Sequence, residues 1–323
     1  MPGPAPAGCY HGIVPHTHEG ARRALIAGLA LTAAFVVVQG ITGFLTGSLA
    51  LVSDAGHMLA DSAGLILALG AATIARRAPD ARRTFGYARA EVLAVPVHVV
   101  LLFMIAGYIV FESVRRLGST PEITTGPVIA VGAAGLLVNL FVLRVLHGHS
   151  HDNLNIRGAT LEALADTLGS VAVIASAIAI SLGAWAGIDA LVGLAIAAFI
   201  LPRAWMLLRQ AGGILLEGAP RGLEPQRIAD AALEVQGVLA VHDVHVWSIA
   251  PSFPAMSAHV ELADAGCTEH VLTDLATLFR DRFGIGHVTL QPETPKLHEA
   301  MECCLSPDAG LLELASHSHG SRV

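Results

Sequence analysis

Two groups of ionisable residues lie inside long apolar stretches of the sequence. Asp54, His57 and Asp61 fall in the second such stretch, and Glu162 and Asp166 fall in the fifth. A charged side chain at the centre of a membrane-spanning helix costs roughly 2.5–3.5 kcal/mol, and such residues usually face the protein interior and mark an ion pathway. The pattern therefore predicts a function in ion transport.

The spacing of these residues indicates which ion is carried. His57 and Asp61 are separated by one helical turn, as are Glu162 and Asp166, so each pair lies on one face of its helix. Imidazole and carboxylate groups bind divalent cations, and two such helices can close four ligands around one metal ion. We predict a transport site made by these four residues. Asp54 is expected to orient the imidazole or to act as an alternative ligand.

The composition is that of a membrane protein with a soluble C-terminal part. Hydrophobic residues make up 54% of the chain and charged residues 14%, and the mean hydropathy is +0.62. Spans of about 20 residues or more are expected at 24–45, 49–75, 90–114, 125–146, 155–182 and 188–208. Arginines concentrate at the N-terminus, in the loops after the even-numbered spans and after the last span. The positive-inside rule therefore predicts that both termini are cytoplasmic.

Past about residue 208 the periodicity becomes that of a small globular domain. Helices are predicted at 228–235 and 268–283, and strands at 238–248, 256–262 and 287–291. The order α-β-β-α-β favours a three-stranded antiparallel or mixed sheet with helices on one face. Such a small core needs support from dimerisation or bound metal. The expected division is a tail at 1–20, a membrane domain at 21–210, a cytosolic domain at 211–296 and a tail at 297–323.

Several classes of function do not fit the sequence. The formal net charge is −7 and the acidic residues form no tail, so we expect no nucleic-acid partner. The chain has no H-E-x-x-H, no nucleophile elbow and no nucleotide-binding glycine loop, which argues against an enzyme and against an organic cofactor. A membrane metal sensor that signals through its cytosolic domain without transport is the alternative function.

Six ordered segments resemble the cation diffusion facilitators, a family of zinc-transporter-like metal/proton antiporters. They are GSLALVSDAGHMLADSAGLILAL (47–69), FGYARAEVLA (85–94), NLNIRGATLEALADTLGSVAVI (153–174), ILLEGAP (214–220), VHDVHVWS (241–248) and HVTLQPE (287–293). The resemblance implies six transmembrane helices, a cytosolic α+β ferredoxin-like domain and a homodimer. It also implies export of Zn²⁺, or of Co²⁺, Cd²⁺, Mn²⁺ or Fe²⁺, from the cytoplasm against inward proton flow.

Glu162 departs from the pattern that the resemblance implies. Zinc-type members usually have histidine at this position, so the predicted site holds one imidazole and three carboxylates. Carboxylate oxygen is a harder ligand, which favours Mn²⁺, Fe²⁺ or Co²⁺ relative to a histidine-rich site without excluding Zn²⁺. Because a metal ion binds deprotonated ligands, metal and protons compete for the site. Alternating exposure of such a site would produce antiport.

Other histidines are candidates for accessory metal sites. His242 and His259 match positions where relatives bind regulatory metal, and His287 is a third candidate; packing at a strand edge or a dimer interface is the alternative. The tract of His147, His149 and His151 is similar to the His-rich loop of relatives, so it either delivers metal or serves as a solvated linker.

The loop between the second and third spans contains Asp80 and five arginines. Some relatives bind a second metal here through His and Asp, but this loop has no histidine, so we predict no metal in it. Its arginines are expected to meet lipid phosphates or carboxylates at the cytoplasmic surface. The richness of the chain in Ala, Gly and Arg indicates a bacterial plasma membrane as the host.

Overall fold

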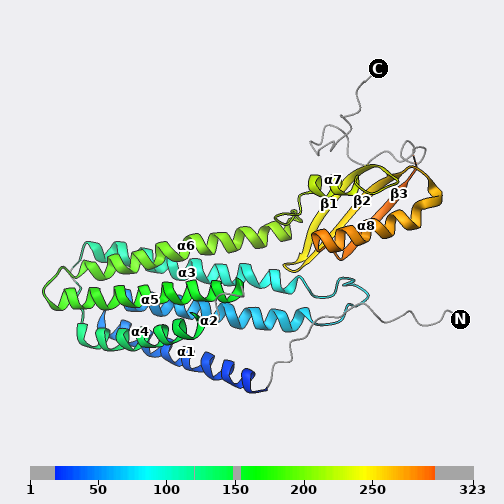
Figure 1. Ribbon diagram of the computed structural model, residues 1–323. Helices are drawn as coiled ribbons and strands as arrows, with labels where there is room; N and C mark the ends of the chain where they lie inside the picture. Colours follow the sequence, from blue (N-terminus) through cyan, green and yellow to red (C-terminus); the bar gives the residue numbers. More distant parts are fainter. Residues whose placement is uncertain (1–18, 120, 148–153, 295–323) are drawn as a thin grey trace. The chain divides into compact units, whose positions relative to one another are not determined.

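The structure is a computed structural model of the 323-residue chain, and it describes residues 19–119, 121–147 and 154–294. The described chain begins with six long helices (Figure 1). They are α1 (Glu19–Thr46), α2 (Leu49–Ala75), α3 (Ala90–Leu117), α4 (Thr125–His147), α5 (Leu154–Ser181) and α6 (Gly187–Leu215). Their bounds agree closely with the predicted spans, except that α6 continues to Leu215 instead of ending near residue 208.

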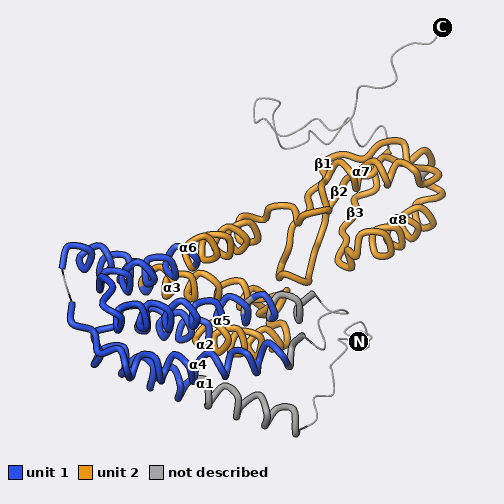
Figure 2. The backbone as a smooth tube through the Cα atoms, turned by 60° about the vertical axis from the view of Figure 1, so that its left-hand side comes forward, with its two compact units in different colours: residues 1–62, 105–199 blue, residues 63–104, 200–323 orange. Residues whose placement is uncertain are grey.

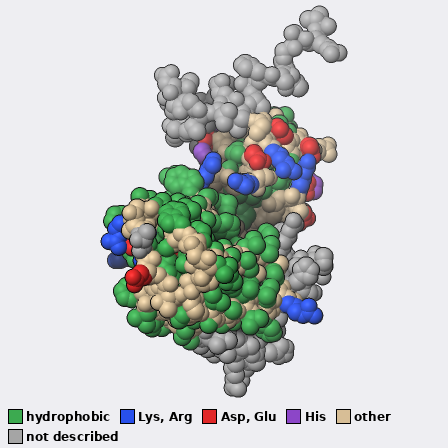
Figure 3. Space-filling view, turned by 90° about the vertical axis from the view of Figure 1, so that its left-hand side faces the viewer, with side chains coloured by type: hydrophobic (Ala, Val, Ile, Leu, Met, Phe, Trp, Pro, Cys, Tyr) green, Lys and Arg blue, Asp and Glu red, His purple; other side chains and the backbone are tan. Residues whose placement is uncertain are grey.

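Five of these helices, α2 to α6, contain segments long and apolar enough to cross a membrane, and the described apolar part of α1, Ala33–Thr46, is shorter. Large apolar side chains on these helices remain exposed, including Phe44, Phe111 and Leu137. Figure 3 shows many hydrophobic side chains on the helical part of the face that it presents, around a patch of other side chains and backbone. Exposed apolar surface of this extent is favourable in hydrocarbon and is a liability in water. The chain is therefore an integral membrane protein.

Two compact units make up the structure (Figure 2). The first contains residues 1–62 and 105–199, and the second contains residues 63–104 and 200–323. In the first unit α5 packs along α4, and α4 packs against α1. One of its apolar clusters consists mainly of small and β-branched residues from α2, α4 and α5, namely Ala50, Leu51, Val128, Val173 and Ala177. Small side chains let helices approach closely, which is how helices associate where lipid removes the hydrophobic driving force.

The second unit contains the small sheet domain. Its elements are α7 (Pro225–Ala232), β1 (Val238–Ala250), β2 (Phe253–Leu262), a short 3-10 helix η1 (Ala265–Cys267), α8 (Thr268–Phe283) and β3 (His287–Glu293). The predicted order α-β-β-α-β is found. The strand order is β1-β2-β3, with β1 antiparallel and β3 parallel to β2, so the sheet is mixed.

The core of this domain lies between the sheet and its helices. Phe279 and Leu275 of α8 and Ile228 of α7 are fully buried and pack with Met256 and Val260 of β2. Helix α8 ends at Gly284, whose φ of +69° is the left-handed conformation that glycine adopts without strain. This turn lets the chain return as β3 beside β2, the strand that carries His259.

Candidate metal centres

The intramembrane cluster is formed by helices α2 and α5 within the first unit. Nε2 of His57 lies 3.5 Å from Oδ2 of Asp61 and 3.4 Å from Oδ1 of Asp166. All three residues offer ligand atoms within 4.8 Å of one another. The one-turn spacing puts His57 and Asp61 on one face of α2, and Asp166 reaches the same point from α5.

These distances suit a bound divalent cation. A tetrahedral ion with bonds of about 2.0–2.2 Å has ligand atoms about 3.3–3.6 Å apart. The two distances from the His57 nitrogen fall within this range. The His57 side chain is only 7% exposed, whereas those of Asp61 and Asp166 are 26% and 19% exposed. The cluster can therefore hold an ion in a largely dry environment while its carboxylates stay partly accessible for ion exchange.

Glu162 lies on α5 one turn before Asp166, as its helical spacing requires. Its side chain is outside the described residues, so its role as the fourth ligand stays a prediction.

Asp54 has a different set of contacts from the three clustered residues. It is buried on α2, and Gln39 of α1 donates an amide hydrogen bond to its Oδ2 at 2.5 Å. A Cβ added to Gly169 of α5 would lie 3.2 Å from Asp54 Oδ1. Glycine at that position thus gives the carboxylate the space that it occupies between three helices. Gln39 is the polar partner that makes the burial of Asp54 tolerable.

Two buried acidic residues on the described apolar helices were not selected from the sequence. Glu112 on α3 and Asp189 on α6 are 5% and 2% exposed. The signal that could have found them is the one used for the transport site, an acidic residue in an apolar stretch. Glu112 accepts bonds from Arg115 at 2.9 Å and Arg116 at 2.8 Å, so its partners are local. The partners of Asp189 are Ser48 and the first two residues of α2, Leu49 and Ala50.

The second cluster lies on the sheet and joins one residue from each strand. His242 of β1 and His259 of β2 are directly paired across the antiparallel ladder, and Glu293 ends β3. Glu293 Oε2 is 3.1 Å from His242 Nε2, and its Oε1 is 2.7 Å from His259 Nδ1. The ligand atoms of all three residues lie within 4.8 Å of one another. Two imidazoles and a carboxylate form a ligand set that divalent zinc accepts.

His287, the third histidine predicted for this site, lies elsewhere. It begins β3, six residues before Glu293, which is about 20 Å along an extended strand. Its ring makes edge-to-face contacts with Phe85 at 5.2 Å and Phe253 at 6.1 Å between centroids. Among the described residues Glu293 takes the place expected for His287. Strand register explains why Glu293 and not His287 joins the cluster. The parallel pairing sets Gln291 opposite His259 and puts Glu293 two residues further on, at the end of the strand.

An irregularity in β1 adds a further carboxylate beside this cluster. The ladder shifts register between His242 and His245, and Asp243 has φ +50°, the sort of bulge that redirects a side chain. Asp243 Oδ1 lies 2.9 Å from His245 Nε2, and Oδ2 lies 3.7 Å from His259 Nε2.

Comparison with known proteins identifies the family. Residues 25–216 match the family described as "Cation efflux transmembrane domain", and residues 220–295 match "Cation efflux protein, cytoplasmic domain". The chain belongs to the cation efflux family. This is the family of cation diffusion facilitators, which are transporters, and the chain is not an enzyme.

Curated relatives in this cation efflux family are similar over almost their whole length. The Metal cation efflux system protein CzcD of Cupriavidus metallidurans is 39% identical over 88% of this chain and 92% of that protein. The Zinc transporter ZitB of Pectobacterium atrosepticum is 37% identical over 86% of this chain and 87% of that protein. The "Cadmium, cobalt and zinc/H(+)-K(+) antiporter" of Bacillus velezensis is 35% identical over 86% and 91%.

In this member of the cation efflux family, the loop between α2 and α3 is organised by Asp80. The carboxylate accepts hydrogen bonds from the backbone N–H groups of Arg82 and Arg83, both at 2.8 Å, and from the Tyr87 hydroxyl at 3.0 Å. These bonds, led by that of Arg82, lower the pKa of Asp80 to about 2. Arg83 also pairs with Asp80, and Arg89 pairs with Glu217 at 2.8 Å. Two of the loop arginines thus meet carboxylates.

The remaining candidate histidines belong to the tract that begins at the end of α4. His147 is the last residue of α4, but its side chain is outside the described residues, as are His149 and His151.

Proposed function

We propose that the chain exports a divalent metal cation from the cytoplasm by proton antiport. The observation that carries this proposal is the group of His57, Asp61 and Asp166, which brings metal-ligating atoms together inside apolar helices. The names of the relatives, which include cation efflux, zinc transport and a cadmium, cobalt and zinc antiporter, support the same class of cargo. Zn²⁺ is the first candidate. Glu162 as fourth ligand would widen the range toward Co²⁺, Mn²⁺ and Fe²⁺.

The exchange of metal for protons follows from the chemistry of the ligands. A divalent ion requires neutral imidazole at His57 and ionised carboxylates at Asp61 and Asp166, so its binding releases any protons that these groups hold. The partial exposure of both carboxylates gives protons and hydrated ions access to the site. If the cluster opens first to the cytoplasm and then to the opposite side, protons arriving there displace the metal.

We also propose how this transporter is arranged in the membrane. Helix α1 supplies the sixth span, and both termini are cytoplasmic, as the positive-inside rule predicts from the arginine distribution. The domain limits remain those of the sequence, a membrane domain at 21–210 and a ferredoxin-like cytosolic domain at 211–296 between two tails. A homodimer in a bacterial plasma membrane fits the small sheet domain and the bacterial relatives. Divalent metal and protons are its small partners.

We also propose that His242, His259 and Glu293 bind regulatory metal. The carboxylate of Glu293 is only 1% exposed and touches both imidazoles. A buried carboxylate with two histidine neighbours on separate strands would let one ion tie the three strands together. Metal there would report the cytoplasmic metal concentration to the transporter.

The test is metal flux in proteoliposomes under an imposed pH gradient, with Zn²⁺, Co²⁺, Cd²⁺, Mn²⁺ and Fe²⁺. Proton-driven flux should be abolished by Asp61→Ala and kept by Asp281→Ala, which removes an exposed carboxylate from α8. Glu162→His should shift the preference toward Zn²⁺. Metal binding without flux for every ion would instead identify a sensor, and flux that ignores the pH gradient would refute antiport.

A further inference from the structure

Asp189 is a buried carboxylate that the metal site does not use. It lies in the first turn of α6, and its contacts are with the beginning of α2. Oδ2 accepts the backbone N–H groups of Leu49, at 2.5 Å, and Ala50, at 3.2 Å. Oδ1 accepts the Ser48 hydroxyl at 2.6 Å, and Ser48 Oγ accepts the N–H of Leu51 at 3.2 Å.

Together Asp189 and Ser48 cap the first turn of α2. The first N–H groups of a helix have no partner within the helix, and leaving them unpaired in a buried, apolar place is costly. Here the first three are all satisfied, two by a residue of another helix. The carboxylate also faces the positive end of the α2 dipole, where a negative charge is stabilised. These capping contacts explain why an acidic residue is buried here, so its burial does not require a bound ion.

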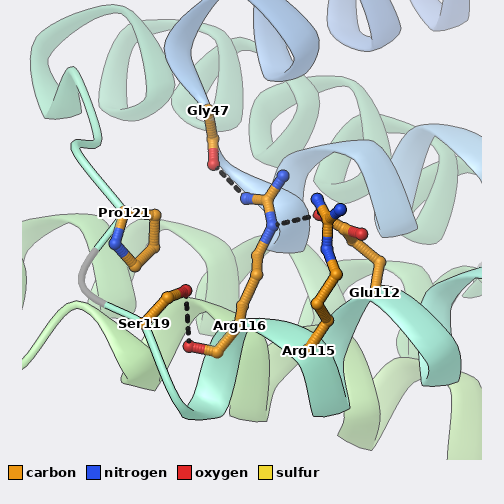
Figure 4. A pocket seen from close by; sticks show the side chains of 6 residues that line it. All are labelled: Gly47, Glu112, Arg115, Arg116, Ser119 and Pro121. Atoms are coloured by element: carbon orange, nitrogen blue, oxygen red, sulfur yellow. Dashed lines mark hydrogen bonds and ion pairs between the residues drawn. The ribbon is translucent and has the colours of Figure 1, made fainter.

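A residue of α3 also contacts the chain just before α2. The Arg116 guanidinium donates to the backbone carbonyl of Gly47 and to the Glu112 carboxylate (Figure 4). Gly47 has φ +73°, and a Cβ there would lie 2.8 Å from the carbonyl oxygen of Glu122. The connection between α1 and α2 is therefore tightly packed, and it is hydrogen-bonded both to Arg116 of α3 and to Asp189 of α6.

Because a helix is rigid, fixing the first turn of α2 also fixes the positions of the side chains further along it. His57 and Asp61 lie eight and twelve residues beyond Leu49, about 12 and 18 Å along the helix axis. A slip of one residue would move both by about 1.5 Å and turn them by about 100°, which would separate them from Asp166. We propose that Asp189 is a positioning residue of the transport site, holding α2 so that His57 and Asp61 meet Asp166.

This inference rests on the proposed function for the metal cluster, and it gives Asp189 neither a metal nor a transported proton. The variants Asp189→Asn and Asp189→Ala separate these roles. Asparagine keeps an oxygen that can accept the Leu49 and Ala50 N–H groups but cannot carry a proton, whereas alanine removes the cap. Both are measured for Zn²⁺ binding to the detergent-solubilised full chain, for flux against pH and for hydrogen exchange of the 49–51 amides. The binding is measured in a Glu293→Gln background, so that the Zn²⁺ reports the intramembrane site and not the cytosolic cluster.

We expect Asp189→Asn to keep metal affinity within about threefold and to retain the pH profile of flux. Asp189→Ala should lose protection of the 49–51 amides and weaken Zn²⁺ binding at least about tenfold, the low end of what lost support for a ligand costs, again without changing the shape of the pH profile. Ser48→Ala should give a smaller loss in the same direction. Ser181→Ala, which removes an exposed serine hydroxyl from the end of α5, is its control.

Two results would overturn the assignment. Asp189→Asn that keeps the amide protection but loses flux or its pH dependence would make Asp189 an ion or proton carrier. Asp189→Ala with wild-type Zn²⁺ affinity would show that the cap does not position the site, and Ser48→Ala decides the same point if the alanine variant does not fold. A wild-type chain that binds Zn²⁺ without flux would refute the exporter and leave these binding comparisons valid.

Discussion

Replacing Glu293 with glutamine should remove metal from the cytosolic cluster, whereas replacing His287 with alanine should leave it bound. The prediction separates the trio suggested by the sequence from the one found in the structure. Glu293 touches both His242 and His259, whereas His287 packs between Phe85 and Phe253. Glutamine preserves size and removes the charge, so the change probes ligation with little effect on packing.

The size of the effect follows from the number of ligands. Four-ligand structural zinc sites bind with about 10–16 kcal/mol of apparent free energy, or about 2.5–4 kcal/mol for each ligand. Since about 1.4 kcal/mol changes an equilibrium constant tenfold, loss of the Glu293 carboxylate should weaken Zn²⁺ binding about a hundredfold to a thousandfold. Loss of the His287 ring should change it less than about threefold.

Isothermal titration of the full chain in detergent measures this directly. An Asp61→Ala background silences the intramembrane site, so any remaining Zn²⁺ reports the cytosolic cluster. Glu293→Gln should lose this Zn²⁺, and Thr289→Ala, an exposed change on the same strand, should not. Loss of Zn²⁺ in His287→Ala together with its retention in Glu293→Gln would refute the assignment. An Asp61→Ala chain that binds no Zn²⁺ would eliminate the cytosolic site itself.

Two further perturbations test contacts that support the sites. The pKa of Asp80, about 2, is below its ordinary value of 3.8, so its stabilisation of the loop is complete above about pH 4 and is lost as the pH falls toward 2. Hydrogen exchange of residues 80–87, corrected for intrinsic rates, should show constant protection from pH 7 to about 4 and less at pH 3. Asp80→Ala should lack this protection throughout, and a wild-type loop that loosens near pH 6 would contradict the reasoning. Gln39→Leu should lower the free energy of unfolding by about 1–3 kcal/mol because it leaves the buried Asp54 carboxylate without its donor; unchanged thermal stability in detergent would count against that pairing.

The helices of this protein are encoded locally. Apolar runs of about 20 residues can satisfy their backbone groups in lipid only as helices, so these helices could be predicted from the sequence, and α2 lies at the predicted residues, 49–75. The one-turn spacing of His57 and Asp61 likewise fixes their common face, because that relation depends only on helix geometry. The helices and strands of the sheet domain could likewise be predicted from the hydrophobic periodicity of short segments.

Relations between elements were decided by the tertiary structure. Nothing in the local pattern says that Gln39 of α1 reaches Asp54, that Asp189 of α6 caps α2, or that strand register brings Glu293, and not His287, to His242. Each contact joins residues far apart in sequence, and its existence depends on which helices and strands are neighbours and at what register. Hydropathy and spacing determine which residues are buried and which face they share; only the packing of whole elements determines the partner that each buried charge finds.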